Sequence, residues 1–104
     1  MGEVYRQGDV LIVPVDSIPA GCKPVKRDNG RVILAYGEVT GHAHAILDEG
    51  VSQVELKEGE RYLNAPDGAT ITHEEHGTIV LPEGVFLIQR QKEYSPEEVR
   101  NVAD

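Results

Sequence analysis

The sequence predicts an all-β fold: a small antiparallel β-barrel or sandwich of roughly seven or eight short strands, with one short C-terminal helix. Eleven glycines and six prolines, spread evenly over 104 residues, divide the chain into short segments. Within these segments the apolar residues are β-branched or alternate with polar ones, as in strands. This length predicts a single domain, residues 1–104, with the strands in 1–94 and the helix in 95–104.

The predicted strands follow one another along the chain and are separated by turn signals. Residues 10–13 form a continuous apolar run, and Pro14 marks its end or an edge position. A long exposed loop is expected over 16–29. Further strands are expected at 31–36, around the residues 42–46, and at 53–57, 62–63, 69–73, 78–81 and 85–88.

The C-terminus is the one segment with a helical pattern. Ser95 is a typical N-cap, Pro96 suits the first helical position, and Glu98 completes a capping box. Val99 and Val102 then follow at helical spacing. A helix this short is marginal in water, so we expect it to pack against the strands or against another subunit.

Composition excludes several classes of protein. The chain has 18 acidic and 10 basic residues, a net charge of −8, which argues against nucleic-acid binding. No run approaches the roughly 18 apolar residues of a membrane span. The N-terminus lacks a signal-peptide pattern, which favours a cytoplasmic location. Cys22 is the only cysteine, so an internal disulfide and a cysteine-rich zinc site are excluded.

All four histidines occur in two close pairs. His42 and His44 are two residues apart, so on a strand they point to the same side. His73 is in phase with the apolar residues of its strand, whereas His76 lies three residues further on. A bend at the intervening Glu-Glu pair would bring His73 and His76 back toward one point.

Imidazoles in such pairs predict a transition-metal site. We expect the four histidines to hold a divalent ion, zinc by default, with iron, manganese or nickel as alternatives. Glu49, Glu74 or Glu75 would supply an oxygen, and Glu74 or Glu75 would also be the candidate catalytic base of a hydrolase or oxygenase. Metal-free acid/base or binding use, and purely structural histidines, remain open alternatives.

Two polar segments, 6–9 and 90–94, lie near the two ends of the chain and could be neighbours in the sheet. Arg6, Arg90 and Tyr94 could form a polar rim around a pocket for a small-molecule substrate. We interpret them instead as a solvated sheet edge, because charged side chains protect exposed strands from pairing.

Four blocks of the sequence resemble a family of small uncharacterised proteins from bacterial and phage genomes. These are RQGDVL at 6–11, GEVTGHAH at 37–44, HEEHG at 73–77 and RQKEYSPEE at 90–98. A looser resemblance is to the cupins, β-barrels that hold a metal on histidines and a glutamate. His42 and His44 followed by Glu49 look like the first cupin motif, while the histidine of the second motif is missing after Pro82-Glu83-Gly84.

The sequence also raises two other functions. A non-enzymatic, homo-oligomeric assembly module would use the histidines structurally, and the small core and few aromatic residues favour burial of further surface between subunits. An acidic mimic of nucleic acid is disfavoured, because the acidic residues are interleaved with Lys and Arg and form no dense tract.

Overall fold

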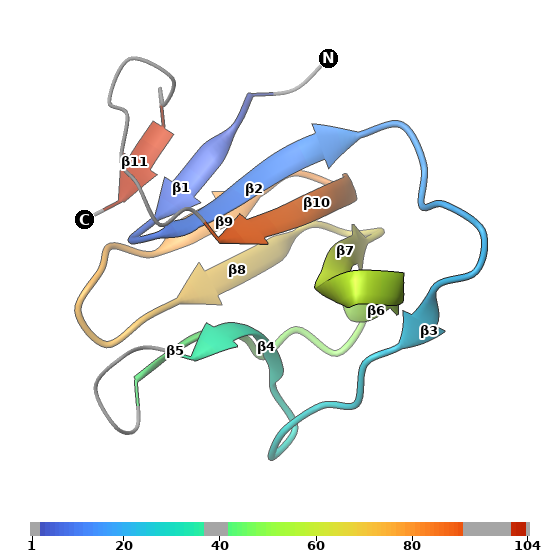
Figure 1. Cartoon of the computed structure of the whole chain (residues 1–104). Helices are drawn as coiled ribbons and strands as arrows, with labels where there is room; N and C mark the ends of the chain where they lie inside the picture. The colour runs from blue at the N-terminus through green and yellow to red at the C-terminus, as the bar shows by residue number, and fades with distance from the viewer. Residues whose placement is uncertain (1–2, 37–41, 91–100, 104) are drawn as a thin grey trace.

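The computed structural model describes residues 3–36, 42–90 and 101–103, which form two β-sheets (Figure 1). The larger sheet has the strand order β11-β1-β2-β10-β7-β6-β3, and the smaller has the order β4-β5-β8-β9. The larger sheet comprises β1 (Tyr5–Gln7), β2 (Val10–Val15), β3 (Lys23–Pro24), β6 (Ser52–Leu56), β7 (Glu60–Ala65), β10 (Gly84–Arg90) and β11 (Asn101–Ala103). The smaller comprises β4 (Val32–Tyr36), β5 (Ala43–Ile46), β8 (Ala69–Thr72) and β9 (Ile79–Leu81), and a 3-10 turn, η1 (Lys57–Gly59), connects β6 to β7.

The prediction of an all-β fold is confirmed, but the barrel alternative is wrong. Among the described residues, the strands at the two ends of each sheet are not hydrogen-bonded to each other, so neither sheet closes on itself. Neighbouring strands are antiparallel except β1 and β11, which pair in parallel. Closure is not needed to bury the apolar faces, because the two sheets share one hydrophobic core.

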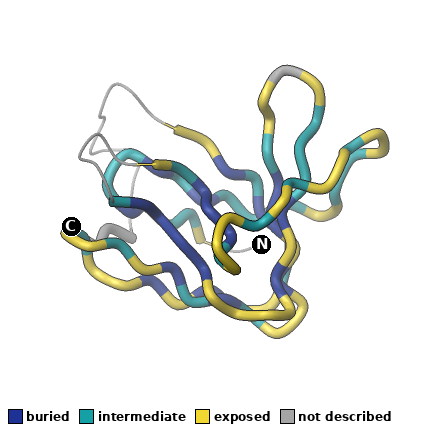
Figure 2. The backbone as a smooth tube through the Cα atoms, turned by 90° about the horizontal axis from the view of Figure 1, so that it is seen from below, coloured by how far each residue is buried: buried dark blue, intermediate teal, exposed yellow. Residues whose placement is uncertain are grey.

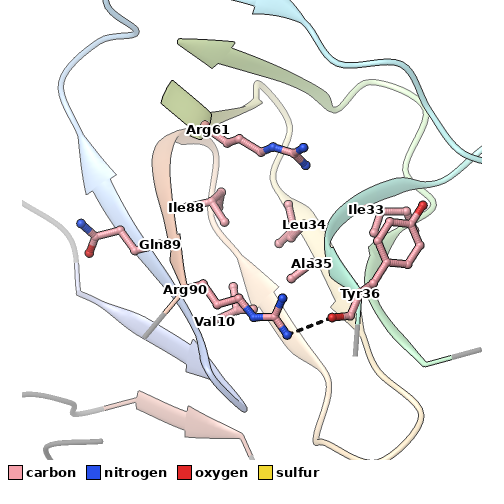
Figure 3. Close-up of a pocket in the computed structure, with 10 residues that line it drawn as sticks. Val10, Ile33, Leu34, Ala35, Tyr36, Arg61, Ile88, Gln89 and Arg90 are labelled. Carbon is pink, nitrogen blue, oxygen red and sulfur yellow. Dashed lines mark hydrogen bonds between the residues drawn. The ribbon is translucent and has the colours of Figure 1, made fainter. Parts of the chain in front are cut away.

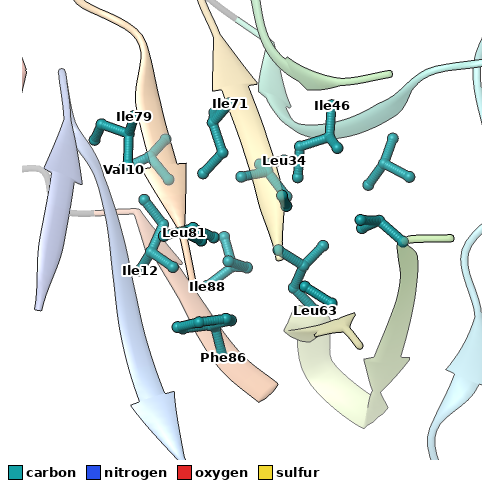
Figure 4. Close-up of a cluster of buried hydrophobic side chains, with 14 residues drawn as sticks. Val10, Ile12, Leu34, Ile46, Leu63, Ile71, Ile79, Leu81, Phe86 and Ile88 are labelled. Atoms are coloured by element: carbon teal, nitrogen blue, oxygen red, sulfur yellow. The ribbon is translucent and has the colours of Figure 1, made fainter. Parts of the chain in front are cut away.

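That core is made of aliphatic side chains from both sheets, with one phenylalanine (Figure 4). β2, β7 and β10 contribute Ile12, Leu63, Phe86 and Ile88, whereas β4, β5, β8 and β9 contribute Leu34, Ile46, Ile71 and Leu81. Figure 2 shows that buried backbone runs through the middle of the strands and that exposed residues gather in the connections. Apolar residues of β2, β7 and β10 are buried as their patterns predict, whereas in β6 the faces are reversed, with the polar Gln53 buried and Val54 and Leu56 half-buried.

Pro14 lies inside β2 rather than at its end. It is opposite Phe86 of β10, while β1 pairs only with the residues Val10 to Ile12 on the other side of β2. Pro14 therefore lies in the part of β2 that pairs with β10 alone, and its missing N–H is tolerated at such an edge position.

The predicted C-terminal helix is wrong where the structure describes it. Asn101–Ala103 is strand β11, with Val102 opposite Arg6 of β1. An edge strand such as β1 offers unpaired backbone groups, and pairing with it competes with a helix that is marginal at this length. The expected helix start at 95–98 lies outside the described residues. Among the described residues no helix is long and apolar enough to cross a membrane.

Three connections place the histidines together. β5 pairs with β8, with Ala45 opposite Thr72, so His44 and His73 lie on adjacent chain segments. The chain bends after β8 at residues 74–76 before entering β9. The β1–β2 hairpin then brings its turn, Gly8 and Asp9, against the same region.

Candidate metal centre

The four histidine rings form one cluster. The ring centroid of His73 lies 4.4 Å from that of His44, 4.5 Å from that of His76 and 5.7 Å from that of His42. The rings of His44 and His76 are nearly parallel, with centroids 5.9 Å apart. The bend expected between His73 and His76 is present, and it brings the second pair up against the first.

His44 is held by a buried glutamine that sequence reasoning did not single out. The side chain of Gln7 is fully buried, and its Nε2 donates to the carbonyl oxygens of Ile71 at 3.0 Å and Gly77 at 2.8 Å. Its Oε1 therefore faces His44 Nδ1 at 2.8 Å and must accept a hydrogen bond from it. The Nδ1 of His44 carries the proton, and its Nε2 is left with a free lone pair.

That lone pair points toward a carboxylate. His44 Nε2 is 3.7 Å from Asp9 Oδ1, while the other oxygen, Asp9 Oδ2, accepts a 2.7 Å hydrogen bond from Arg90 Nε. Burial of Asp9 opposes its ionisation, but the hydrogen bond and charge of Arg90 outweigh it and hold the pKa of Asp9 below its usual value. Asp9 is therefore an anion beside an imidazole nitrogen.

Burial keeps His44 neutral. The side chain is 2% exposed, and burial, together with the neighbouring His73, lowers the pKa of His44 to about 4 despite the opposing charge of Asp9. Burial and His76 also lower the pKa of His73. Neutral imidazole is the form that binds metal ions, so these shifts favour ligation over protonation.

Gly8 makes room for two of the rings. It adopts a φ of +59° at the first position of the two-residue β1–β2 turn, a conformation that suits glycine. A Cβ on this residue would lie 2.6 Å from His76 Nε2 and 3.3 Å from His44 Cε1. Any other residue here would displace His76.

His73, on the more exposed side of the cluster, makes a different kind of hydrogen bond from His44. His73 Nδ1 accepts a 3.0 Å hydrogen bond from the backbone N–H of Glu75. A neutral imidazole has one lone pair, so in this arrangement His73 carries its proton on Nε2. His73 must release the Glu75 amide before it can bind a metal ion.

The candidate carboxylates Glu74 and Glu75 both lie beside His42. Glu74 Oε1 accepts a 2.9 Å hydrogen bond from the N–H of Ala43, which lowers the pKa of Glu74. Glu75 Oε1 is 3.5 Å from His42 Nδ1, and its side chain is 63% exposed. One ligand atom each of His42, His73 and Glu74 lie within 4.8 Å of one another, the spacing of a set that could hold a metal ion.

Glu49 is not part of this arrangement. It lies past the end of β5, in the turn that follows, and it is not one of the residues whose ligand atoms group together. No described contact joins its carboxylate to a histidine. Its backbone carbonyl instead accepts a hydrogen bond from Arg27.

Sequence reasoning missed Gln7 and Asp9. The sequence predicts a solvated sheet edge for their segment, yet Gln7 is fully buried and Asp9 pairs with Arg90 next to His44. The available signal was the proximity expected between the segments 6–9 and 90–94. Tyr94 lies outside the described residues.

A pocket of about 310 Å3 opens next to Arg90 (Figure 3). Its walls are apolar side chains of β2, β4 and β10, with Arg61 and Arg90 at its rim. Arg90 donates to the carbonyl oxygen of Tyr36 at 3.0 Å and to Asp9, and so connects the pocket to the histidine cluster. A small molecule in this pocket would lie close to the cluster.

Residues 6–91 match the family model of a domain of unknown function, DUF8820. The chain belongs to this family. The expectation of a small uncharacterised family is thereby confirmed, and the DUF8820 match contains all four histidines, Gln7, Asp9 and Arg90. No curated protein and no solved structure matches the chain. The resemblance to cupins and the phage association of this DUF8820 protein stay predictions.

Proposed function

We propose that this protein binds a divalent transition-metal ion through its histidine cluster. The observation that carries the proposal is the pair of atoms His44 Nε2 and Asp9 Oδ1, 3.7 Å apart. The hydrogen bond to Gln7 places the only proton of the neutral ring on Nδ1, so two lone pairs face each other with no hydrogen between them. Two such acceptors repel each other, and a cation bound between them would convert the repulsion into attraction.

A bound metal ion accounts for this contact better than a structural role does. The hydrogen bond of His44 engages Nδ1, so its Nε2 is available as a ligand atom. Among the described residues, no donor reaches His44 Nε2. The hydrogen bond from Nδ1 to Gln7 matches the way metal-binding histidines are oriented by a partner on their other nitrogen.

The donor set favours zinc. Imidazole nitrogens with carboxylate oxygens and no thiolate suit zinc, iron or nickel, and manganese where carboxylates predominate. Zinc binds nitrogen and oxygen at about 2.0–2.2 Å, so two ligands of one ion lie about 3–4 Å apart. The 3.7 Å separation of His44 Nε2 and Asp9 Oδ1 falls in this range.

Hydrolysis is the chemistry that the surrounding carboxylates support best. A metal ion with an open position supplies an activated water molecule. Glu75 is the better general base, because its exposed carboxylate stands 3.5 Å from His42, whereas an oxygen of Glu74 is already occupied by the amide of Ala43. Oxygen-dependent chemistry on iron is the alternative. The pocket beside Arg90 is the proposed place for a small-molecule substrate.

The test is metal binding by the full-length chain without a histidine tag. After treatment with a chelator, the protein is dialysed against zinc, and zinc content and melting temperature are measured. We expect at least one equivalent of zinc and a higher melting temperature, since a ligand at 100 times its Kd stabilises the native state by about 2.7 kcal/mol.

Two variants make this test specific. His44→Gln is expected to bind less zinc and to show a smaller thermal shift than the wild type, whereas Gln89→Ala, at an exposed glutamine outside the cluster, should behave like the wild type. A wild-type protein that retains no zinc and shows no thermal shift with zinc, iron, manganese or nickel contradicts the proposal.

A homo-oligomeric assembly module is the second candidate function. β9 ends the smaller sheet, and its Val80 is 70% exposed, which suits pairing between copies along that edge. Light scattering separates the two functions. A monomer that binds zinc supports the metal protein, and a closed oligomer that binds none supports the assembly module.

A further inference from the structure

The cluster contains more donor groups than one zinc ion takes. Four imidazoles and three carboxylates, those of Asp9, Glu74 and Glu75, lie together, whereas a zinc site normally has four ligands at most. These groups are not distributed around a single point. They divide into an outer set and an inner set.

The outer set is His42, His73 and Glu74. One ligand atom of each lies within 4.8 Å of the others. The side chain of His42 is 21% exposed and Glu74 is exposed, so this set opens to solvent. Glu75, 3.5 Å from His42, adds a further oxygen at the same opening.

The inner set is His44, His76 and Asp9. Among the described residues only the outer set brings three ligand atoms within 4.8 Å of one another, so His76 must move closer to share an ion with His44 and Asp9. His44 Nε2 and Asp9 Oδ1 are 3.7 Å apart, and Arg90 holds the second oxygen of Asp9 so that the first faces the ring. The Nε2 of His76 lies against Gly8, the residue before Asp9, and His44 Cε1 flanks the same point. The missing side chain of Gly8 lets both rings approach the hairpin turn.

We propose that the cluster holds two divalent metal ions, one on the outer set and one on the inner set. Each histidine pair of the sequence is then divided, with His42 and His73 on the outer ion and His44 and His76 on the inner ion. The ring of His73 lies 4.4–4.5 Å from those of His44 and His76, so the two ions are neighbours, as in two-metal hydrolytic sites. This inference rests on the proposed function and extends it.

The test is metal stoichiometry. The metal-free, untagged full-length chain is titrated with Co2+, followed by visible absorbance, and with Zn2+, followed by metal analysis after gel filtration. We expect two equivalents per chain. Asp9→Asn and Glu74→Gln should each leave one equivalent, by removing the inner and the outer carboxylate respectively.

Controls separate a lost site from a lost fold. Asp67→Asn changes an exposed aspartate outside both sets and should retain two equivalents. Glu74 is exposed, so Glu74→Gln is expected to fold even if Asp9→Asn does not, and circular dichroism checks both. Gly8→Ala should lower the inner equivalent by displacing His76 while leaving the outer one.

The outcomes are distinguishable. One equivalent in the wild type, unchanged in Asp9→Asn, overturns the two-ion arrangement but leaves the proposed metal protein intact. No bound metal at all refutes both. Two equivalents that fall to one in each carboxylate variant establish the two positions.

Discussion

The ring centroids of His44 and His73 lie 4.4 Å apart, yet the Nδ1 of His44 donates a hydrogen bond whereas the Nδ1 of His73 accepts one. His44 is 2% exposed and donates from Nδ1 to a buried glutamine brought in by the β1–β2 hairpin. His73 is half-buried and accepts at Nδ1 from the amide of Glu75, two residues along its own chain. One ring is fixed by tertiary structure, and the other by its local turn.

This difference shows which part of the cluster is ready for a ligand. The lone pair of His44 is free and faces Asp9, whereas the lone pair of His73 is occupied until the bend at 74–76 rearranges. The pair of His44 and Asp9 is therefore preorganised by the fold, whereas His73 of the outer set must give up a hydrogen bond on binding. Preorganisation lowers the free-energy cost of binding.

The largest effect is expected from Gln7→Leu. This change leaves the buried carbonyl of Ile71 and the buried Nδ1 proton of His44 without their partner, and it also removes the partly buried hydrogen bond to the carbonyl of Gly77. We expect a loss of about 3 kcal/mol in the free energy of unfolding, because each unsatisfied buried polar group is costly. Urea unfolding measures it. Gln89→Leu, at an exposed glutamine, should change stability by less than about 0.5 kcal/mol, and equal effects of the two would contradict the role of Gln7.

Removing the ring of His44 should lower the stability of the protein more than removing the ring of His73. His44→Ala removes a buried ring and leaves Gln7 Oε1 without a donor, so we expect it to destabilise the metal-free protein by about 2 kcal/mol. His73→Ala, in the turn, should cost about 0.5 kcal/mol. Chemical denaturation of both variants with chelator present provides the comparison. A larger cost for His73→Ala would reverse the assignment of inner and outer rings.

The pH dependence of stability offers a further contrast. Burial lowers the pKa of His44 from 6.5 to about 4, so between these values the unfolded chain binds more protons than the folded one. The stabilisation from neutral His44 is complete above pH 6.5 and is lost as the pH falls toward 4. We expect the unfolding free energy of the metal-free wild type to fall more steeply over this interval than that of His44→Gln. Parallel pH profiles would show that burial does not shift this histidine.

The smallest effect is expected from Glu74→Gln. An amide oxygen can still accept the hydrogen bond from the N–H of Ala43. Only the extra strength that a charged acceptor gives this hydrogen bond is lost, so we expect the free energy of unfolding to fall by about 0.5 kcal/mol. Thermal melting without metal should therefore barely change, although metal affinity falls. A loss above about 2 kcal/mol would mean that Glu74 supports the fold rather than the metal.

Local patterns in the sequence predicted most of the strands and the bend between His73 and His76. Alternation at 53–57 and the apolar runs at 10–13 and 85–88 correspond to β6, β2 and β10. The helix predicted over 95–104 is wrong at 101–103, because Asn101–Ala103 pairs with the edge of β1. A capping box is a local signal, and it carries no information about an edge strand about 90 residues away in the chain.

The sequence by itself determined which kinds of side chain are available as metal ligands. With Cys22 as the only cysteine and the histidines in two pairs, imidazole and carboxylate are the ligands available, and the family follows from residues 6–91. Tertiary structure alone decided which groups support those histidines. Gln7 is 37 residues from His44 and Asp9 is 81 residues from Arg90, so these contacts exist because the β1–β2 turn meets β5 and β10 in the folded sheets. Burial there keeps His44 neutral and its Nε2 free, and no local pattern encodes burial produced by strands that meet from distant parts of the chain.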